Sequence, residues 1–328
     1  MGADTAVEPR STAVEVHVKP VMSKADVRQL VKDKVQMEDK HFNIRVEGET
    51  TLVFKPEGLL AALVCDVPDH QVLQDANDKL YRGVAKNVPT RISALGVPSK
   101  YHTKPDGTPE LISRPDRNHP RYIYARKYAR DGVMGALDPT TNKAEYARIK
   151  LDVNDIPTAF AHAELLRDVY AEYAPEHYQR QMEAIAKVHP HWAMRGLPFT
   201  TATDNWCFPT YPHVESGDFK PGLGIITVKY YGACPYSWLV LPRYDLGILV
   251  KAGDVLLVDV GNEVHANTAI PEHDGYGTTS GRLATIHYLR PKLANCGTPE
   301  EESRRRELYL AKVAAKREAR QRARRRCK

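Results

Sequence analysis

The sequence predicts an α+β protein whose C-terminal half is an antiparallel barrel or jelly roll flanked by helices. After Gly196, short β-rich runs follow one another, separated by turns that contain Gly, Pro and Asp. The runs are TVKYYG, SWLVLP, LGILV, DVLLVDV and RLATIHYLR. Several such strands within about 90 residues are typical of sandwiches and barrels. Upstream, apolar side chains recur at helical intervals from Ile156 to Val188, which predicts helices that pack on the sheet.

The first third of the chain predicts mixed structure. Residues 1–45 are polar and lack sustained periodicity, so we expect a partly disordered N-terminal arm with one short helix near Ala25 to Val35. Alternation in FNIRVEG and TLVFKPEG predicts a pair of strands, followed by a short helix at Leu59 to Val64. The segment Gly96 to Pro120 carries five prolines and several charges, which indicates an irregular surface excursion.

The main domain is expected to span residues 46–292, with the barrel core at about 196–292. Within it, Pro175 divides the helical segment into two helices. Residues 298–328 are Glu-rich and then Arg-rich. This order predicts a C-terminal helix that is acidic at its start and basic at its end, as the helix dipole favours.

Charge is distributed unevenly along the chain. The segment Ser303 to Lys328 holds twelve Lys or Arg against Glu307 and Glu318, a local balance of +10, while the whole chain carries +6. The remainder is therefore mildly acidic, at about −4. A basic tail on such a body suggests a contact element for a polyanion, with nucleic acid as the first candidate. The alternative is a solvated helix end.

Composition points to an intracellular protein, in the nucleus or cytoplasm, that is neither secreted nor inserted in a membrane. No apolar run is long enough to span a bilayer, and the opening MGADTAVEPR lacks the apolar stretch of a signal peptide. The cysteines are odd in number, scattered and never arranged as CxxC, which argues against a disulfide framework or a structural zinc site. We expect reduced thiols and a monomer.

His-x-acid pairs occur twice, in different surroundings. His162 and Glu164 lie in the helical segment, where side chains two residues apart point to nearly opposite sides, so we expect both at the surface. His213 and Glu215 lie in TYPHVESGDF at the edge of the strand-rich region, where residues two apart share a face and can reach one metal ion. The second pair is therefore the candidate metal motif.

A mononuclear iron(II) oxygenase holds its metal with two imidazoles and one carboxylate, so a distant histidine is needed beside His213 and Glu215. His265 follows the strand DVLLVDV after a short turn, where a strand end at a barrel rim can place a ligand. The alternative for His265 is a hydrogen-bonded rim histidine. Two competitors are weaker, since His273 lies in a glycine-rich loop and His287 lies on the opposite side of its strand from the arginine described next.

Arg282 is the candidate anchor for an acidic co-substrate. Strand alternation in GRLATIHYLR places it on one side with Ala284, Ile286 and Tyr288. The planar fork of arginine binds a carboxylate through two hydrogen bonds and stays ionised, which suits the distal carboxylate of 2-oxoglutarate. A structural ion pair with a nearby Asp is the alternative for Arg282, and Arg290 is the alternative anchor.

These motifs occur in one order, as FTTATDNWCFPTYPHVESGDFKPGLG, then LVLPRYDLGILVKAGDVLLVDVGNEVHANTAI, then GRLATIHYLR. From Phe199 to Arg290 this order resembles the TET/JBP family of 2-oxoglutarate/iron(II) nucleobase dioxygenases. Family members carry a His-x-Asp after an Asn-containing strand, a Gly-Asp-Val-Leu strand leading to the distal His, an Asn two residues later, and a final strand that opens with Arg. The matching positions, in order, are Asn205, His213, Gly253, Asp254, His265, Asn267 and Arg282.

Similarity to this family implies a double-stranded β-helix fold and an iron(II) centre held by His213, Glu215 and His265. It implies 2-oxoglutarate and O₂ as co-substrates, with ascorbate as a further candidate reductant. The implied reaction is oxidation of the 5-methyl group of thymine or 5-methylcytosine in DNA. A base inside a duplex is out of reach, so the target base must be flipped out or single-stranded.

The resemblance implies a different role for each of several residues near the metal motif. Glu215 stands where the family usually has Asp, which lengthens the ligand arm by one methylene. Asp218 matches a position where the family has Asn or Asp and is a candidate co-substrate contact, with capping of the SGD turn as the alternative. Asn205 is a further candidate cofactor-binding residue. Asn205, Trp206 and Tyr211 either read the substrate base or belong to the barrel core.

Two other functions stay open at the level of sequence. The first is a hydroxylase of the same fold that acts on a protein or a small molecule, in which the basic tail has no DNA role. The second is a catalytically inactive DNA-binding relative, for which Glu215 in place of Asp is the only argument.

Overall fold

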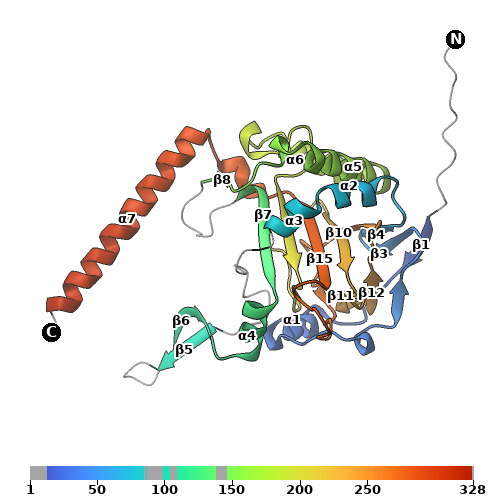
Figure 1. Cartoon of the computed structure of the whole chain (residues 1–328), viewed down its shortest axis with the longest axis horizontal. Helices are drawn as coiled ribbons and strands as arrows, with labels where there is room; N and C mark the ends of the chain where they lie inside the picture. The colour runs from blue at the N-terminus through green and yellow to red at the C-terminus, as the bar shows by residue number, and fades with distance from the viewer. Residues whose placement is uncertain (1–12, 85, 87–98, 104–108, 138–145, 327–328) are drawn as a thin grey trace, which may run out of the picture.

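The computed structural model describes residues 13–84, 86, 99–103, 109–137 and 146–326. The described strands form a large sheet, a small sheet and a hairpin (Figure 1). The large sheet runs in the order β1 (Val14–His17), β3 (Thr51–Lys55), β4 (Gly58–Val64), β13 (Val255–Val258), β10 (Gly224–Tyr231), β15 (Gly281–Tyr288), β9 (Thr201–Trp206), β7 (Arg130–Leu137) and β8 (Arg148–Ile149). The small sheet runs in the order β14 (Ala266–Asn267), β11 (Trp238–Leu241), β12 (Leu246–Leu249) and β2 (Ile44–Val46). The hairpin joins β5 (Ser99–Thr103) to β6 (Pro109–Pro115).

The chain winds between the two sheets as a double-stranded β-helix. β9 lies in the large sheet, the segment at His213 pairs with His265 beside the small sheet, β10 returns to the large sheet, and β11 and β12 lie in the small one. The alternation continues with β13, β14 and β15. Neighbouring strands within this core are antiparallel. The predicted jelly roll is therefore confirmed, and each of the five β-rich runs contains a strand.

The N-terminal part of the chain extends both sheets. β1, β3 and β4 continue the large sheet beyond β13, whereas β2 pairs in parallel with β12 of the small sheet. The two runs predicted to pair with each other thus belong to different sheets. Residues 13–45, predicted as an arm, contribute β1, β2 and the helix α1, and Met37 and Phe42 are buried. The polar composition of this segment does not reveal that it forms strands, because an edge strand such as β1 buries few side chains.

Residues 59–64 belong to strand β4, so the helix predicted there is wrong. The run GLLAALV is apolar without interruption, and such a short run does not distinguish a buried helix from a strand covered on both faces. Pairing with β3 on one side and β13 on the other decides in favour of the strand. Of the predicted excursion at 96–120, the described part contains the β5–β6 hairpin, a turn at residues 116–119 and the beginning of a helix at Pro120. The rest lies outside the described residues.

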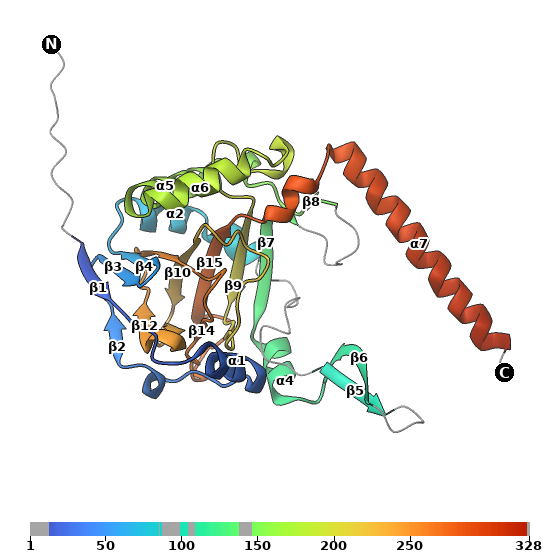
Figure 2. The same ribbon diagram turned by 180° about the vertical axis from the view of Figure 1, so that it is seen from behind.

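Helices cover the outer face of the large sheet (Figures 1 and 2). The described helices are α1 (Lys24–Asp33), α2 (His70–Ala76), α3 (Asp78–Val84), α4 (Pro120–Lys127), α5 (Pro157–Tyr173), α6 (Pro175–Ile185) and α7 (Pro299–Arg326). Short 3₁₀ turns lie at Asp39–His41, Val153–Asp155, Pro190–Trp192, Pro242–Tyr244 and Pro291–Asn295. None of the described helices is both long and apolar enough to cross a membrane. The described cysteines Cys65, Cys207, Cys234 and Cys296 are all free.

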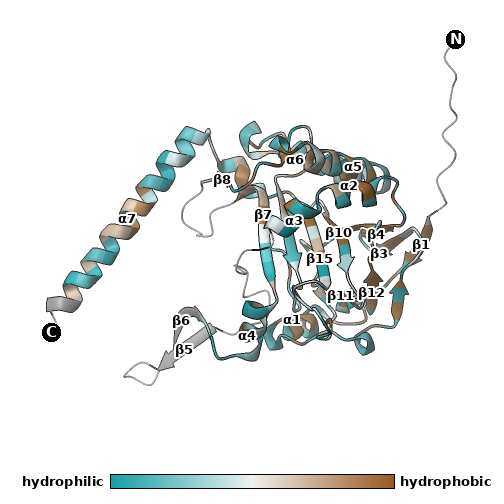
Figure 3. Cartoon of the chain, viewed as in Figure 1, coloured by the Kyte–Doolittle hydropathy of each residue, from teal (hydrophilic) through white to brown (hydrophobic). Residues whose placement is uncertain are grey.

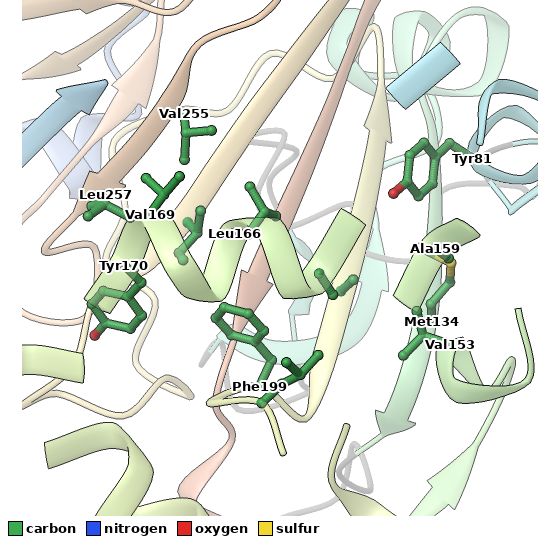
Figure 4. Packing of buried hydrophobic residues seen from close by; sticks show 14 of the residues in the cluster. Tyr81, Met134, Val153, Ala159, Leu166, Val169, Tyr170, Phe199, Val255 and Leu257 are labelled. Carbon is green, nitrogen blue, oxygen red and sulfur yellow. The ribbon is translucent and has the colours of Figure 1, made fainter. Parts of the chain in front are cut away.

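The predicted helical pair packs on the sheet as expected. Pro175 begins α6, where its fixed φ suits the first helical position, and separates it from α5. α5 places Leu166, Val169 and Tyr170 in one apolar cluster with side chains of β13 (Figure 4). A second apolar cluster fills the space between the two sheets, and its members include Val228 of β10. The barrel is thus held from outside by helices and from inside by its own strands.

Three fully buried histidines lie between α2, α5 and the outer face of the large sheet. The ring centroid of His162 lies 5.0 Å from that of His70 and 6.0 Å from that of His287. The prediction that His162 is a surface residue is wrong, because its spacing from Glu164 does not reveal which side of α5 faces the sheet. Glu164 takes the outer side, and 43% of its side chain is exposed.

Burial keeps these imidazoles uncharged. It lowers the pKa of His70 to about 4 and the pKa of His287 to about 3. It also holds the pKa of His162 well below its usual range, and the neighbouring His70 and His287 add to that effect. On β9, burial raises the pKa of Asp204 to about 7, although a hydrogen bond from Thr285 opposes the shift.

We predict that acid destabilises the fold through this cluster. In the unfolded chain each histidine takes up a proton near pH 6.5. In the folded chain His70 and His287 do so only at about pH 4 and about pH 3, and the pKa of His162 is also held well below its usual range. Between these values the unfolded state binds more protons, so the free energy of unfolding falls as the pH is lowered. Asp204 acts in the opposite sense, because the folded chain keeps its proton. Within this cluster, three histidines against one carboxyl contribute about two protons to the slope, or about 2.7 kcal/mol per pH unit at the steepest point.

Urea unfolding between pH 4.5 and 6.5 measures this slope. His287→Leu removes one buried imidazole and should reduce the slope by about one proton. His17→Gln is the matched control, since His17 is exposed on β1 and should leave the slope as it is. An unchanged slope in His287→Leu would contradict the assignment.

Candidate metal centre

Two backbone hydrogen bonds place the candidate imidazoles side by side. The His213 amide donates to the His265 carbonyl at 3.1 Å, and the His265 amide donates to the His213 carbonyl at 3.0 Å. The two residues thus form one antiparallel pair, whose side chains point to the same face. Their ring centroids lie 4.3 Å apart. The segment between β9 and β10 therefore supplies the His213 ring, and the turn between β13 and β14 supplies the His265 ring.

Backbone carbonyls fix the tautomer of both rings. Nδ1 of His213 lies 2.7 Å from the carbonyl oxygen of Tyr211, and Nδ1 of His265 lies 3.2 Å from that of Glu263. A carbonyl oxygen can only accept, so each Nδ1 carries the hydrogen and donates it. Nε2 is then the lone-pair nitrogen of each ring, which is the form that a metal ion requires.

Glu215 completes a group of three donors. Its amide donates to the Val260 carbonyl at 3.0 Å, and its Oε1 lies 3.3 Å from Nε2 of His213. One donor atom each from His213, Glu215 and His265 lies within 4.8 Å of the others, and within the described part of the chain no other three His, Cys, Asp or Glu residues converge in this way. Two imidazoles and one carboxylate are the donor set of non-haem iron(II) oxygenases, so these residues fit iron(II).

Burial of His265 favours its role as a ligand. Burial, and then the neighbouring His213, lower the pKa of His265 to about 3, while Glu215 opposes the shift. The ring therefore stays neutral near pH 7 and keeps its lone pair available. The other two donors are more open, since 20% of the His213 side chain and 35% of the Glu215 side chain are exposed.

The three donors line a cavity of about 240 Å³ inside the barrel. Its apolar walls come from both sheets and comprise Ile226, Leu239, Val250, Leu256, Val260, Ala284 and Ile286. One end is closed by buried residues such as Phe208, whereas the other reaches the surface at Gly217 and Asp218. We call the end at Gly217 and Asp218 the mouth. An apolar cavity with a few convergent polar groups is the usual form of a small-molecule site.

Arg282 reaches the cavity from its closed end. The Phe219 amide donates to the Leu289 carbonyl, so the mouth lies beside the end of β15, whereas Arg282 is near the beginning of that strand. As strand alternation predicts, Arg282 lines the same cavity as Ala284 and Ile286. Only 7% of Arg282 is exposed, and its Nε has no hydrogen-bond partner among the described residues. A buried guanidinium with an unused donor suits a carboxylate bound in the cavity.

A second arginine, Arg290, lines the cavity at the mouth. One of its terminal nitrogens donates to the Tyr288 hydroxyl at 2.9 Å, and that hydroxyl lies 2.9 Å from Oγ1 of Thr203. Because Arg290 already has this partner, Arg282 is the better candidate for a co-substrate carboxylate. The predicted site does not include Tyr288 or Thr203, although even spacing from Arg282 along β15 is the signal that places Tyr288 there.

The remaining predicted co-substrate residues lie at opposite ends of the cavity. Asn205 is buried on β9 and pairs with Ala284 of β15, two residues from Arg282. Asp218 is half-buried at the mouth, where its amide donates to the Glu215 carbonyl at 3.1 Å and closes a turn. Both side chains line the cavity. Asn205 thus lies near Arg282, and Asp218 lies near Glu215.

Asn267 is a further polar residue of the cavity. It follows His265 by two residues, so it shares that residue's face of the strand. Its Oδ1 accepts a hydrogen bond from the Thr210 hydroxyl at 2.6 Å, and its Nδ2 has no partner among the described residues. The predicted site does not include Thr210, because nothing in the sequence near it signals the pairing with Asn267.

Two aromatic residues near the metal motif lie outside the cavity. Trp206 belongs to the outer apolar cluster, and its indole N–H donates to the Gly277 carbonyl at 2.9 Å, so it is a core residue. Tyr211 lies under the guanidinium of Arg121, at 3.8 Å from ring centroid to carbon, and lines a separate surface pocket. Of the three residues considered for base recognition, only Asn205 faces the cavity.

Comparison with known proteins agrees with this geometry. Residues 143–291 match the Tet_JBP family model, described as the oxygenase domain of the 2OGFeDO superfamily. Thymine dioxygenase JBP1 of Trypanosoma brucei brucei is 28% identical over 198 residues, which are 55% of this chain and 23% of that protein. The bifunctional helicase and thymine dioxygenase JBP2 of Leishmania infantum is 32% identical over 169 residues, which are 49% of this chain and 14% of that protein.

The chain thus spans less than a quarter of the length of either relative. Among solved structures, NgTET1 in complex with 5mC DNA gives a TM-score of 0.47 at 12% identity, with 83% of this chain and 93% of that chain covered. The family match runs from before α5 to the end of β15 and contains all three metal donors, Arg282 and Asn205. Residues 143–291 therefore match the TET/JBP family of 2-oxoglutarate/iron(II) oxygenase domains.

Proposed function

We propose that the chain is an iron(II)- and 2-oxoglutarate-dependent dioxygenase that hydroxylates the 5-methyl group of a DNA pyrimidine, thymine or 5-methylcytosine. The observation that carries the proposal is the meeting of His213, Glu215 and His265 with buried Arg282 in one cavity. A three-donor metal group beside a deeper guanidinium suits a ligand with a chelating 2-oxo acid at one end and a second carboxylate at the other. 2-Oxoglutarate is such a ligand.

The overall reaction converts the substrate methyl group, 2-oxoglutarate and O₂ into a hydroxymethyl group, succinate and CO₂. Iron(II), when bound, supplies the O₂ chemistry that protein side chains lack. His213 and His265 would hold the metal through Nε2, since the carbonyls behind them set the tautomer, and Glu215 would hold it through its carboxylate. Arg282 binds and orients the distal carboxylate. The apolar walls exclude water from the reacting groups.

The choice of a nucleobase as substrate is supported by the relatives, whose names state thymine dioxygenase activity. A base that enters the cavity must leave its stack, and enzymes that act on flipped bases recognise the base edge by hydrogen bonds. At the mouth, Asp218 offers an acceptor and Arg290 a donor, next to the hydroxyl of Tyr288. These three side chains are the proposed contacts for the substrate.

Loss of any one metal donor should prevent iron binding. We predict that His213→Ala, Glu215→Ala and His265→Ala each lower the affinity for Fe(II) at least about 100-fold, because each removes one of three protein ligands. Glu215→Asp keeps the carboxylate on a shorter arm and should retain part of the affinity. Anaerobic titration with Fe(II) measures these affinities, with His17→Ala as the exposed control. Parent-like affinity in Glu215→Ala would mean that the assigned triad is wrong.

Arg282→Ala should raise the KM for 2-oxoglutarate about 100-fold while leaving Fe(II) affinity near that of the parent, since a bidentate charged contact is worth about 3 kcal/mol. Arg282→Lys should restore part of the loss, because lysine keeps the charge but not the planar fork. Arg290→Ala serves as the matched comparison and should raise the KM for DNA instead. If only Arg290→Ala changes the KM for 2-oxoglutarate, the anchor is Arg290.

Mass spectrometry of nucleosides tests the reaction itself. With Fe(II), 2-oxoglutarate and O₂, DNA containing thymine and 5-methylcytosine should yield a 5-hydroxymethyl nucleoside and an equal amount of succinate. His265→Ala should yield neither. The base that is oxidised identifies the substrate. Oxidation of neither base, together with iron-dependent turnover of 2-oxoglutarate, would leave a dioxygenase with a different substrate.

A further inference from the structure

Helix α7 leaves the body of the protein close to the cavity mouth. Arg290 lines the mouth just after β15, and the 3₁₀ turn Pro291–Asn295 leads from there to α7. The turn is well held, because Leu293 and Cys296 lie in a buried cluster with Trp192. The C-terminal helix is therefore joined to the substrate end of the barrel by a short, packed connection.

The base of α7 is fixed by hydrogen bonds. Glu302 is 1% exposed, and its Oε1 accepts from the Gly297 amide at 2.8 Å and from Arg305 at 2.6 Å. The Trp192 indole N–H donates to the Gly297 carbonyl at 2.8 Å. A helix fixed at its first turn keeps its direction over the turns that follow, so α7 points away from the body (Figures 1 and 2).

Beyond its base, α7 contacts the body through Tyr309, whose ring centroid lies 6.1 Å from that of Tyr146. From residue 303 to residue 323 every side chain is exposed except Tyr309, which is half-buried. Arg304, Arg305 and Arg306 are consecutive, so they point in three directions about 100° apart around the axis. Figure 3 shows hydrophilic residues along most of the helix. A helix that is basic on all sides lacks the apolar stripe that packs on a protein core.

Exposed cations also lie on the body, on elements close to the connection between β15 and α7. Lys292 is exposed on the 3₁₀ turn, which contacts α6, and Lys187 is exposed just after α6. Lys220 is exposed next to Phe219, whose amide is bonded to the end of β15. These lysines thus lie on elements that adjoin the end of β15 or the turn that leads to α7.

We propose that α7 is a duplex-binding arm that lies along a DNA groove and holds the duplex by its phosphates while the target base enters the mouth. Charge on all sides favours this partner, because a helix in the major groove has a row of phosphates on each side. An acidic protein would instead call for cations on one face. Residues 303–326 span about 36 Å at 1.5 Å per residue, about one turn of B-DNA. The choice of DNA rests on the proposed function.

The salt dependence of binding to a 30-base-pair duplex tests the arm. The arm variant is Arg317→Gln/Arg320→Gln/Arg322→Gln, in which glutamine preserves helix propensity while three exposed charges are removed. Each phosphate contact contributes about 0.9 to the slope of log K against log salt, so the slope should become about 2.7 shallower. Turnover of a short single-stranded substrate should match that of the parent.

The control variant is Lys24→Gln/Arg28→Gln/Lys32→Gln, which removes the same number of exposed charges from α1 on the body. It should keep the slope of the parent. Equal slopes for the arm variant and the parent would overturn the proposal, as would an equal loss in both variants, which reflects net charge alone. Binding is measured without Fe(II) or 2-oxoglutarate, so an inactive metal centre leaves this result unaffected, and circular dichroism verifies the helix.

Discussion

The pairing of His213 with His265 is the interaction on which the site depends. It consists of two backbone hydrogen bonds, and it is an isolated pair outside the longer strands. The same segment is held a second time where the Glu215 amide donates to Val260. Because the backbone is bonded at both positions, the two rings and the carboxylate meet at one point without long flexible loops. The carbonyls that accept from each Nδ1 then turn both Nε2 atoms toward the cavity.

Strand β15 serves two environments through its alternation. Toward the barrel interior it presents Arg282 and Ala284, beside the metal donors. Toward the helices it presents Thr285, which donates to buried Asp204, and His287, which belongs to the histidine cluster. The buried polar groups on the helix-facing side of the sheet are thus separated from the cavity by the thickness of the sheet. The imidazoles outside the barrel are therefore not part of the candidate metal group.

Much of the barrel could be predicted because its strands are short, β-rich and bounded by turn residues. The candidate metal motif could be singled out because residues two apart point to opposite sides of a helix but to the same face of a strand, which separates His213 from His162. The burial of His162 could not be predicted, since the spacing of residues along α5 does not tell which side of the helix the sheet covers. The strand β4 could not be predicted either, because an uninterrupted apolar run fits both a buried helix and a central strand.

Contacts between segments that are distant in the sequence could not be predicted either. The pairing of β2 with β12 and the bond between Thr210 and Asn267 join parts of the chain that no local pattern connects. Residues 13–45 read as an arm for the same reason, since their partners come from later in the chain. By contrast, the position of Arg282 on the same face as Ala284 and Ile286 could be predicted, because it depends only on the alternation of side chains along one strand.

The metal donors and Arg282 are proposed to bind the two ends of one 2-oxo acid. Iron(II) chelated by a 2-oxo acid gives a visible charge-transfer absorption, which can be followed without O₂. Titration of the Fe(II)-loaded parent with 2-oxoglutarate should give this band at much lower concentration than titration of Arg282→Ala. With pyruvate, which lacks the distal carboxylate, the parent and Arg282→Ala should respond alike. The same 2-oxoglutarate dependence in both proteins would contradict this proposal.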